Sequence, residues 1–461
     1  MGPRQVADAM TTARPDFLLT DLYELAMMQA YYETGQTGTA VFEFFVRKLP
    51  AGRNFLVAAG LEQVLRFLED LHPAPDELAW LAGSGHASRD MIDRLAGFRF
   101  TGDVDAMPEG TVFFPEEPIL RVTAPLPEAQ YVETRIINIL HFQSLVASKA
   151  SRMVLAAEGR TLLDFGLRRA HGAEAGMWAA RACYVAGVSG SSNTLAERTY
   201  GVPAAGTMAH SFVQAFDSET AAFEAFARAR PDRLVLLIDT YDTIAGARRV
   251  VSLAPRLRAM GITVGGVRLD SGDLDTLSRS VRDILDAGGL RDVTILASGG
   301  LDETAIHRLV AAGAPIDGFG VGTSLTTSSD APALDCAYKL QEYAGRARRK
   351  RSEGKATWPG RKQVWRHVDA NGCMAGDTLS CASDPQKGLP LLRRVMQDGR
   401  RVAPPPPLDA IRSHAARERD RLPPALRALQ TAPRYEVRIS DSLRRLAADV
   451  DGFIDRGDAP R

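Results

Sequence analysis

The sequence predicts an α/β protein that contains an α/β barrel and a second, mixed α+β domain. Three observations support this prediction: apolar runs rich in β-branched residues, small polar or charged residues at the end of each run, and helical periodicity between the runs. The runs end within residues 161–166, 234–240, 264–273, 293–300 and 316–324. The last four of these follow one another at intervals of roughly 25–30 residues, about the length of a βαβ unit.

The segments between these runs have the apolar spacing of amphipathic helices. Apolar side chains recur three and four residues apart near residues 244–260, 277–285 and 306–310. Apolar strands that alternate with amphipathic helices indicate a parallel sheet covered by helices. Because each strand carries its polar residues at its carboxyl end, we predict a barrel with its site at that end. A doubly wound open sheet is the structural alternative.

The chain of 461 residues is too long for one barrel and suggests two domains. We assign residues 1–150 to an N-terminal α/β domain and residues 151–330 to the barrel. The barrel pattern stops after residue 326. We assign residues 331–461 to a C-terminal segment that packs back on the N-terminal domain.

The N-terminal segment has a mixed α+β pattern. It predicts a first helix that begins near Thr20 or Asp21. Further helices are expected at 60–71 and 135–153, and strands at 40–46 and 110–122.

The composition indicates a soluble cytoplasmic protein. Basic and acidic residues balance at 56 each, so no net field favours nucleic acid or an anionic membrane. The four cysteines lack the spacing of a metal site, which suits a reducing compartment. No apolar run approaches the ~20 residues that span a bilayer, and the N-terminus has no signal-peptide core. We therefore expect no nucleic-acid partner and no membrane.

Two segments after the barrel are distinctive. Residues 346–355 are strongly basic, which is typical of a solvated loop, with a loop that faces a phosphate as the alternative. Residues 403–407 are rich in proline and predict a stiff, extended connector.

Charged residues gather at the carboxyl ends of neighbouring predicted strands. Asp239, Asp270 and Asp273 offer carboxylates to a magnesium-bound polyphosphate or a ribose. Arg268 offers a cation to an anion, and a plain ion pair with Asp239 is the alternative. His210 carries the side chain best suited to accept a proton or a phosphoryl group near neutral pH, although a lone histidine is more often structural.

Two glycine-containing loops also follow predicted strands. Residues 298–300 and 320–324 leave backbone N–H groups open where helices would begin, an arrangement that cradles a phosphate. Glycines in such turns often serve geometry only, but the two loops together with the acidic cluster indicate a phosphorylated ligand. Phe165, beside Asp164 at another strand end, offers a ring that could stack on a flat heterocycle or pack in the core.

These residues lie within an ordered series of motifs that resembles the nicotinate phosphoribosyltransferases, type II phosphoribosyltransferases of NAD salvage. The matching motifs occupy residues 19–23, 164–169, 190–193, 206–211, 239–241, 266–273 and 320–324. The resemblance extends over nearly the whole chain to about residue 366. It implies an irregular, TIM-like α/β barrel as the catalytic domain, residues 151–330, joined to a smaller α/β sandwich domain, residues 1–150. This agrees with the barrel and the mixed N-terminal domain that the sequence pattern predicts.

The resemblance implies an ATP-coupled enzyme of pyridine nucleotide and NAD biosynthesis. In the reaction that the resemblance implies, the ring nitrogen of nicotinate displaces pyrophosphate from phosphoribosyl pyrophosphate and yields nicotinate mononucleotide. Mg²⁺ is the cofactor and ATP is the co-substrate. His210 matches a histidine that is transiently phosphorylated by ATP. Tyr23 matches a tyrosine that the other subunit of a homodimer contributes, so that the active sites are shared.

The resemblance also implies roles for individual residues. Arg268 and Thr207 match residues near the nicotinate carboxylate, and Phe165 matches the ring that stacks on the pyridine. Asp239 and Asp270 fall where relatives handle ribose and Mg²⁺. The 5-phosphate cradle matches Gly299, Gly300, Gly322 and Thr323. The remaining substrate-binding candidates are Arg168, Ser192, Ser211, Asp273 and Ser298.

The choice between nicotinate and nicotinamide depends on one position. Relatives that use nicotinamide have an aspartate where this chain has Ser192, and that aspartate would accept the amide N–H and repel a carboxylate. The neutral Ser192 near Arg268 therefore favours nicotinate. The alternatives are a nicotinamide or quinolinate phosphoribosyltransferase, or a non-catalytic barrel that binds a nucleotide.

Overall fold

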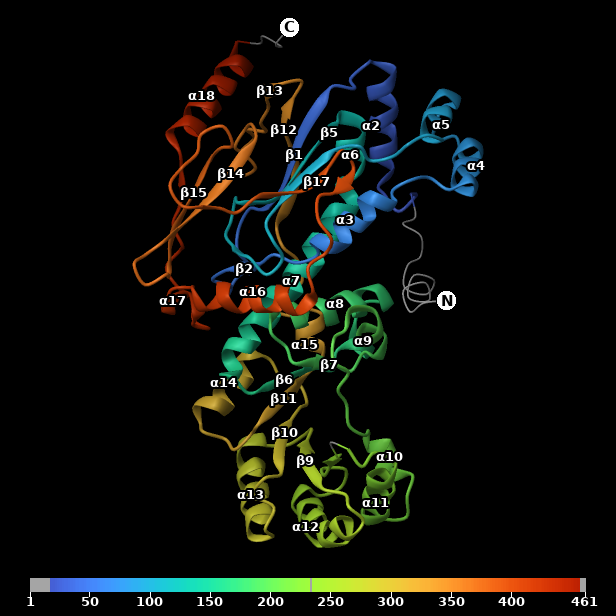
Figure 1. Ribbon diagram of the computed structural model, residues 1–461, viewed down its shortest axis with the longest axis vertical. Coiled ribbons are helices and arrows are strands. Elements are labelled where there is room, and N and C mark those ends of the chain that lie inside the picture. Colours follow the sequence, from blue (N-terminus) through green and yellow to red (C-terminus); the bar gives the residue numbers. More distant parts are fainter. Residues whose placement is uncertain (1–16, 233, 457–461) are drawn as a thin grey trace. The chain divides into compact units, whose positions relative to one another are not determined.

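The computed structural model describes residues 17–232 and 234–456 (Figure 1). Internal contacts divide the described residues into two compact units, one within 149–332 and the other formed by 17–148 together with 333–456. After their main sheets, we call the first the parallel unit and the second the antiparallel unit.

The parallel unit is built on a six-stranded sheet with the order β7-β6-β11-β10-β9-β8. All five neighbouring pairs are parallel. The strands are β6 (Thr161–Asp164), β7 (Gly190–Ser191), β8 (Leu234–Leu237), β9 (Val264–Leu269), β10 (Thr294–Ala297) and β11 (Gly318–Val321). Every residue of β11 is buried, as expected for a strand covered on both faces.

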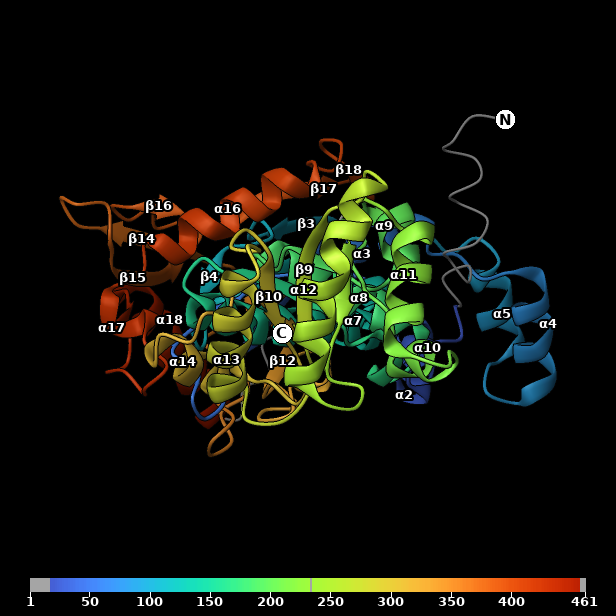
Figure 2. The same cartoon turned by 90° about the horizontal axis from the view of Figure 1, so that it is seen from below.

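The helices of this unit follow the strands. They are α8 (Ala173–Ala186), α9 (Thr194–Tyr200), α10 (His210–Gln214), α11 (Glu219–Ala229), α12 (Thr243–Ala259), α13 (Leu274–Ala287), α14 (Glu303–Ala311) and α15 (Thr323–Thr326), with a 3₁₀ turn at Leu167–Arg169. The three helices predicted near residues 244–260, 277–285 and 306–310 are confirmed as α12, α13 and α14. Figure 2 shows α12 and α13 side by side along β9 and β10.

The start of each of these three helices is fixed by an aspartate. Asp242, Asp273 and Asp302 each accept a hydrogen bond from a backbone N–H in the first turn of α12, α13 and α14 respectively. An N-cap of this kind contributes about 1 kcal/mol to helix stability. The polar residue that follows each strand therefore also determines where the next helix begins.

The closed barrel predicted from the sequence is not confirmed. Within the described residues the sheet ends at β7 and β8, so it is a curled half-barrel with two edges. The chain between these strands forms α9, α10 and α11 instead of further strands, and Ser191 makes only an isolated bridge to Ala204. The short apolar run before His210 is too brief to continue the sheet.

The antiparallel unit contains a seven-stranded sheet with the order β13-β12-β1-β5-β3-β17-β18. Its strands are β1 (Thr39–Val46), β3 (Asp103–Ala106), β5 (Pro118–Pro125), β12 (Cys336–Tyr343), β13 (Arg346–Ala347), β17 (Arg393–Gln397) and β18 (Arg400–Arg401). A four-stranded sheet has the order β16-β14-β15-β19, and β2 pairs with β4. These strands are β2 (Leu56–Val57), β4 (Val112–Phe113), β14 (Lys362–Val368), β15 (Met374–Cys381), β16 (Leu389–Pro390) and β19 (Val437–Ile439).

Helices complete this unit: α2 (Leu22–Glu33), α3 (Leu61–Asp70), α4 (Pro75–Ser84), α5 (Arg89–Leu95), α6 (Leu126–Tyr131), α7 (Glu133–Ala157), α16 (Leu408–Asp420), α17 (Pro424–Arg427) and α18 (Asp441–Asp455). The last residues of α7 belong to the parallel unit. Strands β12 and β17, which follow the parallel unit in sequence, pair with β1 and β3, which precede it.

One predicted strand of this unit is wrong in extent. The run at 110–122 is not continuous, because a turn separates β4 from β5. In that turn Glu116 has a φ of 70°, and the Glu117 carboxylate accepts a hydrogen bond from Phe114 N at 2.8 Å. Strand β1 and helices α3 and α7 agree with the predictions to within a few residues.

No helix within the described ranges is long and apolar enough to cross a bilayer.

Candidate functional site

The carboxyl ends of the parallel strands gather the predicted polar residues at one edge of the sheet. Asp239 follows β8, Asp270 follows β9, Ser298 follows β10 and Phe165 follows β6, while Arg268 is the next-to-last residue of β9. Parallel strands bring their carboxyl ends to the same edge, which is where ligands of open α/β sheets bind. Hydrogen bonds join most of these residues into one cluster.

Arg268 is the centre of this cluster. Its Nη2 donates to Asp270 Oδ1 at 2.7 Å, its Nε to Ser298 Oγ at 2.8 Å and its Nη1 to Thr207 Oγ1 at 3.0 Å. Its Cζ also lies 5.4 Å from the centroid of the Phe165 ring. Three partners from separate segments hold the guanidinium in one orientation, so a fixed cation lies against an aromatic ring.

Asp270 is held as a carboxylate. Its Oδ1 accepts hydrogen bonds from Arg268 Nη2 and from Ser298 Oγ, at 2.7 and 2.5 Å, and its Oδ2 lies 3.6 Å from His210 Nε2. Partial burial opposes ionisation, but the hydrogen bonds from Ser298 and Arg268 and the charges of Arg268 and His210 outweigh it and lower the pKa of Asp270.

His210 begins α10, and its ring bridges two strand ends. Its Nδ1 lies 3.2 Å from Thr240 Oγ1, and its Nε2 faces Asp270. The side chain is 39% exposed. An oriented, accessible imidazole beside a carboxylate can exchange a proton or accept a phosphoryl group.

Asp239 contributes a free acceptor at the same edge. Its Oδ2 accepts hydrogen bonds from Asp270 N at 2.8 Å and from Ser271 Oγ at 2.7 Å. Its Oδ1 is buried and has no hydrogen-bond partner among the described residues. A buried carboxylate oxygen of this kind is satisfied by a cation or by a ligand hydroxyl.

The residues around Asp239 can be compared with the ligands that a metal ion needs. No set of three or more His, Cys, Asp or Glu side chains in the described part of the chain is arranged to hold a metal ion. Mg²⁺ usually binds through one or two carboxylates plus substrate phosphates. Asp239 with its free Oδ1, and Asp270 beside it, fit that mode of binding.

The glycine loops allow the backbone to approach closely. Gly299 has a φ of 96°, and a Cβ there would lie 1.9 Å from Asp270 O. A Cβ at Gly320 would lie 2.5 Å from the Phe165 ring. Gly299 therefore keeps its loop against the Asp270 strand end, and Gly320 makes room for the ring. Gly300, Gly322 and Thr323 lie in the same two loops, and Thr323 is the exposed first residue of α15.

A buried aspartate joins the β6 and β7 ends. Asp164 Oδ1 accepts from Gly166 N at 2.8 Å, and Oδ2 accepts from Ser191 Oγ at 2.7 Å. Its backbone carbonyl accepts from Ser192 N at 2.8 Å. Burial raises the pKa of Asp164. Asp164 thereby fixes the segments that carry Phe165 and Ser192.

The remaining predicted residues have fewer contacts. Arg168 and Ser211 are exposed, on the 3₁₀ turn and on α10 respectively. Asp273 is exposed and caps α13, where it accepts from Thr276 Oγ1 at 2.7 Å. Tyr23 is 46% exposed on α2 and belongs to the antiparallel unit.

Sequence reasoning did not assign roles to three contacting residues. Thr240 contacts His210, and Asp164 with Ser191 fixes the β6 and β7 ends. All three lie inside or beside the motifs at 164–169, 190–193 and 239–241, which was the available signal. Their contacts come from different segments and could not be deduced from spacing along the chain.

Comparisons with known proteins identify the same family in successive segments of the chain. Family models match the nicotinate phosphoribosyltransferase N-terminal domain at residues 18–141, the family's main domain at 161–355 and its C-terminal domain at 384–447. A Mycobacterium tuberculosis protein named nicotinate phosphoribosyltransferase pncB2 is 54% identical over 428 residues, which cover 92% of each chain.

Two further relatives extend this likeness. The Bacillus subtilis nicotinate phosphoribosyltransferase is 40% identical over 372 residues, covering 79% of this chain and 76% of its own. The crystal structure of human nicotinic acid phosphoribosyltransferase superposes with a TM-score of 0.84 at 30% identity, covering 94% of this chain and all of that one. This chain belongs to the nicotinate phosphoribosyltransferase family.

Proposed function

We propose that this protein is an ATP-coupled nicotinate phosphoribosyltransferase, a cytoplasmic enzyme of NAD biosynthesis that makes nicotinate mononucleotide. The observation that carries the proposal is Arg268, which is held by Thr207, Ser298 and Asp270 and lies against the Phe165 ring. A guanidinium beside an aromatic face is complementary to nicotinate, a planar ring that bears a carboxylate. The names of the relatives support the same substrate.

Arg268 and Phe165 would orient the pyridine for reaction. The nicotinate carboxylate would accept a hydrogen bond from a guanidinium N–H group that the cluster does not use, and the pyridine ring would stack on Phe165. Ser192, neutral and exposed at the end of β7, places no negative charge beside that carboxylate. Oriented in this way, the pyridine nitrogen attacks the anomeric carbon of phosphoribosyl pyrophosphate as the bond to pyrophosphate breaks. Catalysis then depends mainly on positioning and charge.

The acidic residues and glycine loops would bind the phosphoribosyl group. Asp239, through its unpartnered Oδ1, accepts a ribose hydroxyl or holds Mg²⁺ together with Asp270. When bound, Mg²⁺ would neutralise the pyrophosphate that leaves. The backbone N–H groups of residues 299–300 and 322–323 would cradle the 5-phosphate, because glycines there let a phosphate approach the main chain. The N–H group of Ser298, which the sequence also suggested, instead donates to Leu269 O at 2.8 Å.

His210 would couple ATP to the reaction. Thr240 orients the ring through Nδ1, and Nε2 is the nitrogen left for phosphoryl transfer. A bond forms from the γ-phosphorus of ATP to this nitrogen as the bond to ADP breaks, and water later hydrolyses the phosphohistidine. The phosphorylated side chain adds negative charge beside Asp270, which reshapes the charge balance of the pocket in each cycle.

The direct test is a competition assay. The enzyme receives phosphoribosyl pyrophosphate, Mg²⁺ and equal nicotinate and nicotinamide, with and without ATP. We expect nicotinate mononucleotide, and more of it when ATP is present. Nicotinamide mononucleotide as the main product would contradict the role of Ser192. Undiminished ATP stimulation of His210→Ala would remove the phosphohistidine from the proposal while leaving the transferase activity in place.

A further inference from the structure

Four charged side chains of the parallel unit form a cluster that the proposed function does not use. Lys149 and Arg152 lie near the end of α7, in the part of this helix that belongs to the parallel unit. Glu303 is the first residue of α14, and Asp330 lies in the turn after α15. All but Asp330 are buried. Buried ion pairs add little net stability over apolar side chains of similar volume, so stability alone does not explain this cluster.

Lys149 joins two acids that come from different elements. Its Nζ donates a hydrogen bond to Glu303 Oε2 and lies 2.7 Å from Asp330 Oδ1. Arg152 Nε donates to Glu303 Oε1 at 3.2 Å, so both oxygens of that carboxylate are bound. Charge-assisted hydrogen bonds of this kind are short and directional. Lys149 thus links the start of α14 to the turn after α15, and we call this contact the lysine bridge.

Glu303 is closely coupled to the first glycine loop. Only Leu301 and Asp302 separate it from Gly300. Leu301 is buried, and the Asp302 carboxylate accepts a hydrogen bond from Ala305 N at 2.8 Å, which caps α14. Because this short connection is held by a buried side chain and a cap, the position of Glu303 determines where the glycine loop can lie.

Asp330 is coupled in the same way to the second glycine loop. Helix α15 begins at Thr323, inside that loop, and a turn follows the helix directly. The backbone N–H of Ser328 donates to Leu325 O at 3.1 Å, and Ser328 Oγ donates to Ala331 O at 2.9 Å. These bonds fix the turn, and Asp330 within it, relative to α15. A shift of Asp330 is therefore passed to the start of α15.

The two glycine loops are neighbours, because β10 and β11 pair in parallel and each loop follows one of these strands. The lysine bridge joins the segments that come directly after the two loops. Its two ion pairs therefore fix the separation of the loops from each other. Backbone N–H groups of two loops can bind one phosphate together only when that separation is correct.

We propose that Lys149 is a positioning residue for phosphoribosyl pyrophosphate: by joining Glu303 to Asp330 it holds residues 299–300 and 322–323 at the separation that one 5-phosphate needs. This inference rests on the proposed function, which assigns both loops to that phosphate. Lys149 itself is buried and acts through the two acids. Misplacement of binding groups by about 1 Å can cost an enzyme ~100-fold in rate, so a buried cation that sets a loop separation affects substrate binding.

The test breaks the lysine bridge at Asp330, whose side chain is 38% exposed and can be changed without opening the core. Asp330→Asn keeps the size and removes the charge, whereas Asp330→Glu keeps the charge. In the full-length protein we expect Asp330→Asn to raise the Kd of ribose 5-phosphate, measured by titration calorimetry, about tenfold. The KM for phosphoribosyl pyrophosphate should rise equally and the KM for nicotinate should not change. Asp330→Glu should bind ribose 5-phosphate nearly as tightly as the wild type.

A second variant shows whether Asp330 acts through Lys149. Lys149→Met removes the bridge completely, so adding Asp330→Asn to it should weaken the binding of ribose 5-phosphate no further. If Lys149→Met does not fold, the two Asp330 variants are sufficient, because they leave the buried pair of Lys149 and Glu303 in place.

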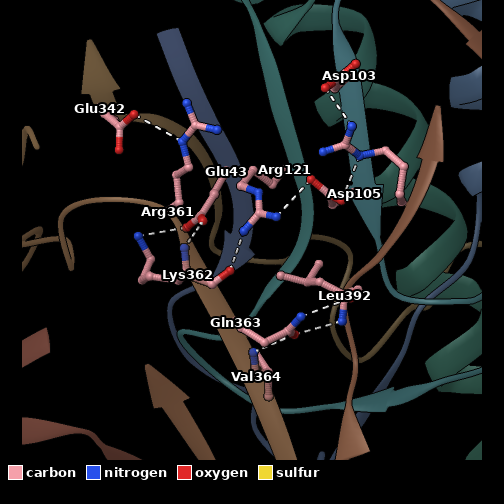
Figure 3. Close-up of polar contacts among 11 residues, drawn as sticks. Glu43, Asp103, Asp105, Arg121, Glu342, Arg361, Lys362, Gln363, Val364 and Leu392 are labelled. Atoms are coloured by element: carbon pink, nitrogen blue, oxygen red, sulfur yellow. Dashed lines mark hydrogen bonds and ion pairs between the residues drawn. The ribbon is translucent and has the colours of Figure 1, made fainter. Parts of the chain in front are cut away.

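A cluster of similar composition in the antiparallel unit provides the control. Arg394 donates to Asp103 at 2.6 Å and to Asp105 at 3.0 Å, and Asp105 also accepts from Arg121 at 2.8 Å. Figure 3 shows both aspartates on β3. The side chain of Asp103 is 28% exposed, so Asp103→Asn removes a comparable ion pair. It should leave both KM values and the Kd of ribose 5-phosphate unchanged.

Each contrary result has a separate meaning. Unchanged binding of ribose 5-phosphate by Asp330→Asn would overturn the inference and leave the proposed function in place. Equal rises in both KM values, or the same effects in Asp103→Asn, would also overturn it, because they indicate a general loss of structure. Wild-type protein that neither binds ribose 5-phosphate nor makes nicotinate mononucleotide would overturn the proposed function as well. If binding responds to Asp330→Asn as expected but no product forms, the inference about the lysine bridge stands and the proposed reaction does not.

Discussion

Arg268 shows how one residue depends on several others for its orientation. Lysine at this position would keep the charge, but its single ammonium cannot reach Thr207, Ser298 and Asp270 together. We expect Arg268→Lys to raise the KM for nicotinate by about 10- to 100-fold, the effect of losing a charge-assisted hydrogen-bond set worth about 1.5–3 kcal/mol. Steady-state kinetics with nicotinate as the varied substrate measure it.

The control is Arg279→Lys on α13, an exposed arginine that pairs with Asp275. It should leave the kinetics unchanged. An Arg268→Lys enzyme with a normal KM for nicotinate would show that this side chain does not bind the substrate carboxylate.

Glu24 provides a prediction about pH. Burial, opposed by a hydrogen bond from Gln130 and reinforced by Glu133, raises the pKa of Glu24 from 4.5 to about 7. Between these values the folded protein binds more protons at Glu24 than the unfolded chain does, so Glu24 lowers stability progressively as pH rises from 4.5 to 7. At 1.36 kcal/mol per pKa unit, the penalty above pH 7 is about 3 kcal/mol at most.

Glu24→Gln should therefore unfold at a higher temperature than the wild type at pH 8, and at nearly the same temperature at pH 4.5. Melting curves across this range measure the difference. Glu33→Gln, on the exposed part of the same helix, should show no such divergence. Parallel profiles for Glu24→Gln and the wild type would mean that Glu24 stays ionised when folded.

At the scale of elements, Gly299 decides whether the loop after β10 can form. An added Cβ would meet Asp270 O at 1.9 Å, and the φ of 96° disfavours any side chain. Gly299→Ala must displace either this loop or the Asp270 strand end. We expect a soluble protein with an at least tenfold higher KM for phosphoribosyl pyrophosphate, measured at saturating nicotinate.

Gly300 is the matched control for this change. It also has a positive φ, of 65°, but a Cβ there has no atom within 4 Å. Gly300→Ala should lower the stability by about 1 kcal/mol and should reduce the activity much less than Gly299→Ala does. Equal kinetic effects in the two variants would show that backbone strain, and not the contact with Asp270, is responsible.

The elements also explain what the sequence could and could not predict. Runs such as 264–273 predict strands because the strand preference of β-branched apolar residues is a local property of the chain. The carboxyl ends of parallel strands lie at one edge of the sheet, which brings Arg268 and Asp270 close to Asp239. The half-barrel could not be predicted, because β7 has only two residues and its edge depends on the pairing of distant segments. The link between His210 and Thr240 is likewise tertiary.

At the scale of the whole molecule, Tyr23 belongs to the antiparallel unit and His210 to the parallel unit. We expect the active protein to be a homodimer in which Tyr23 of each subunit completes the site that contains His210 of the other. Tyr23→Ala and His210→Ala should each be poorly active alone. After the two are unfolded, mixed and refolded together, half of the dimers are mixed, and each mixed dimer has one site without either substitution. Activity should return to roughly a quarter of the wild-type value.

The reciprocal mixture distinguishes sharing from a site within one subunit. When the double variant Tyr23→Ala/His210→Ala is mixed with wild-type chains, a shared arrangement places one substitution in each site of a mixed dimer, so both sites lose activity. A site built within one subunit gives the opposite pair of results: no recovery in the first mixture, and full activity of the wild-type subunits in the second. The two mixtures therefore determine whether Tyr23 acts across a dimer interface, and recovery in the first also requires that the dimer itself exists.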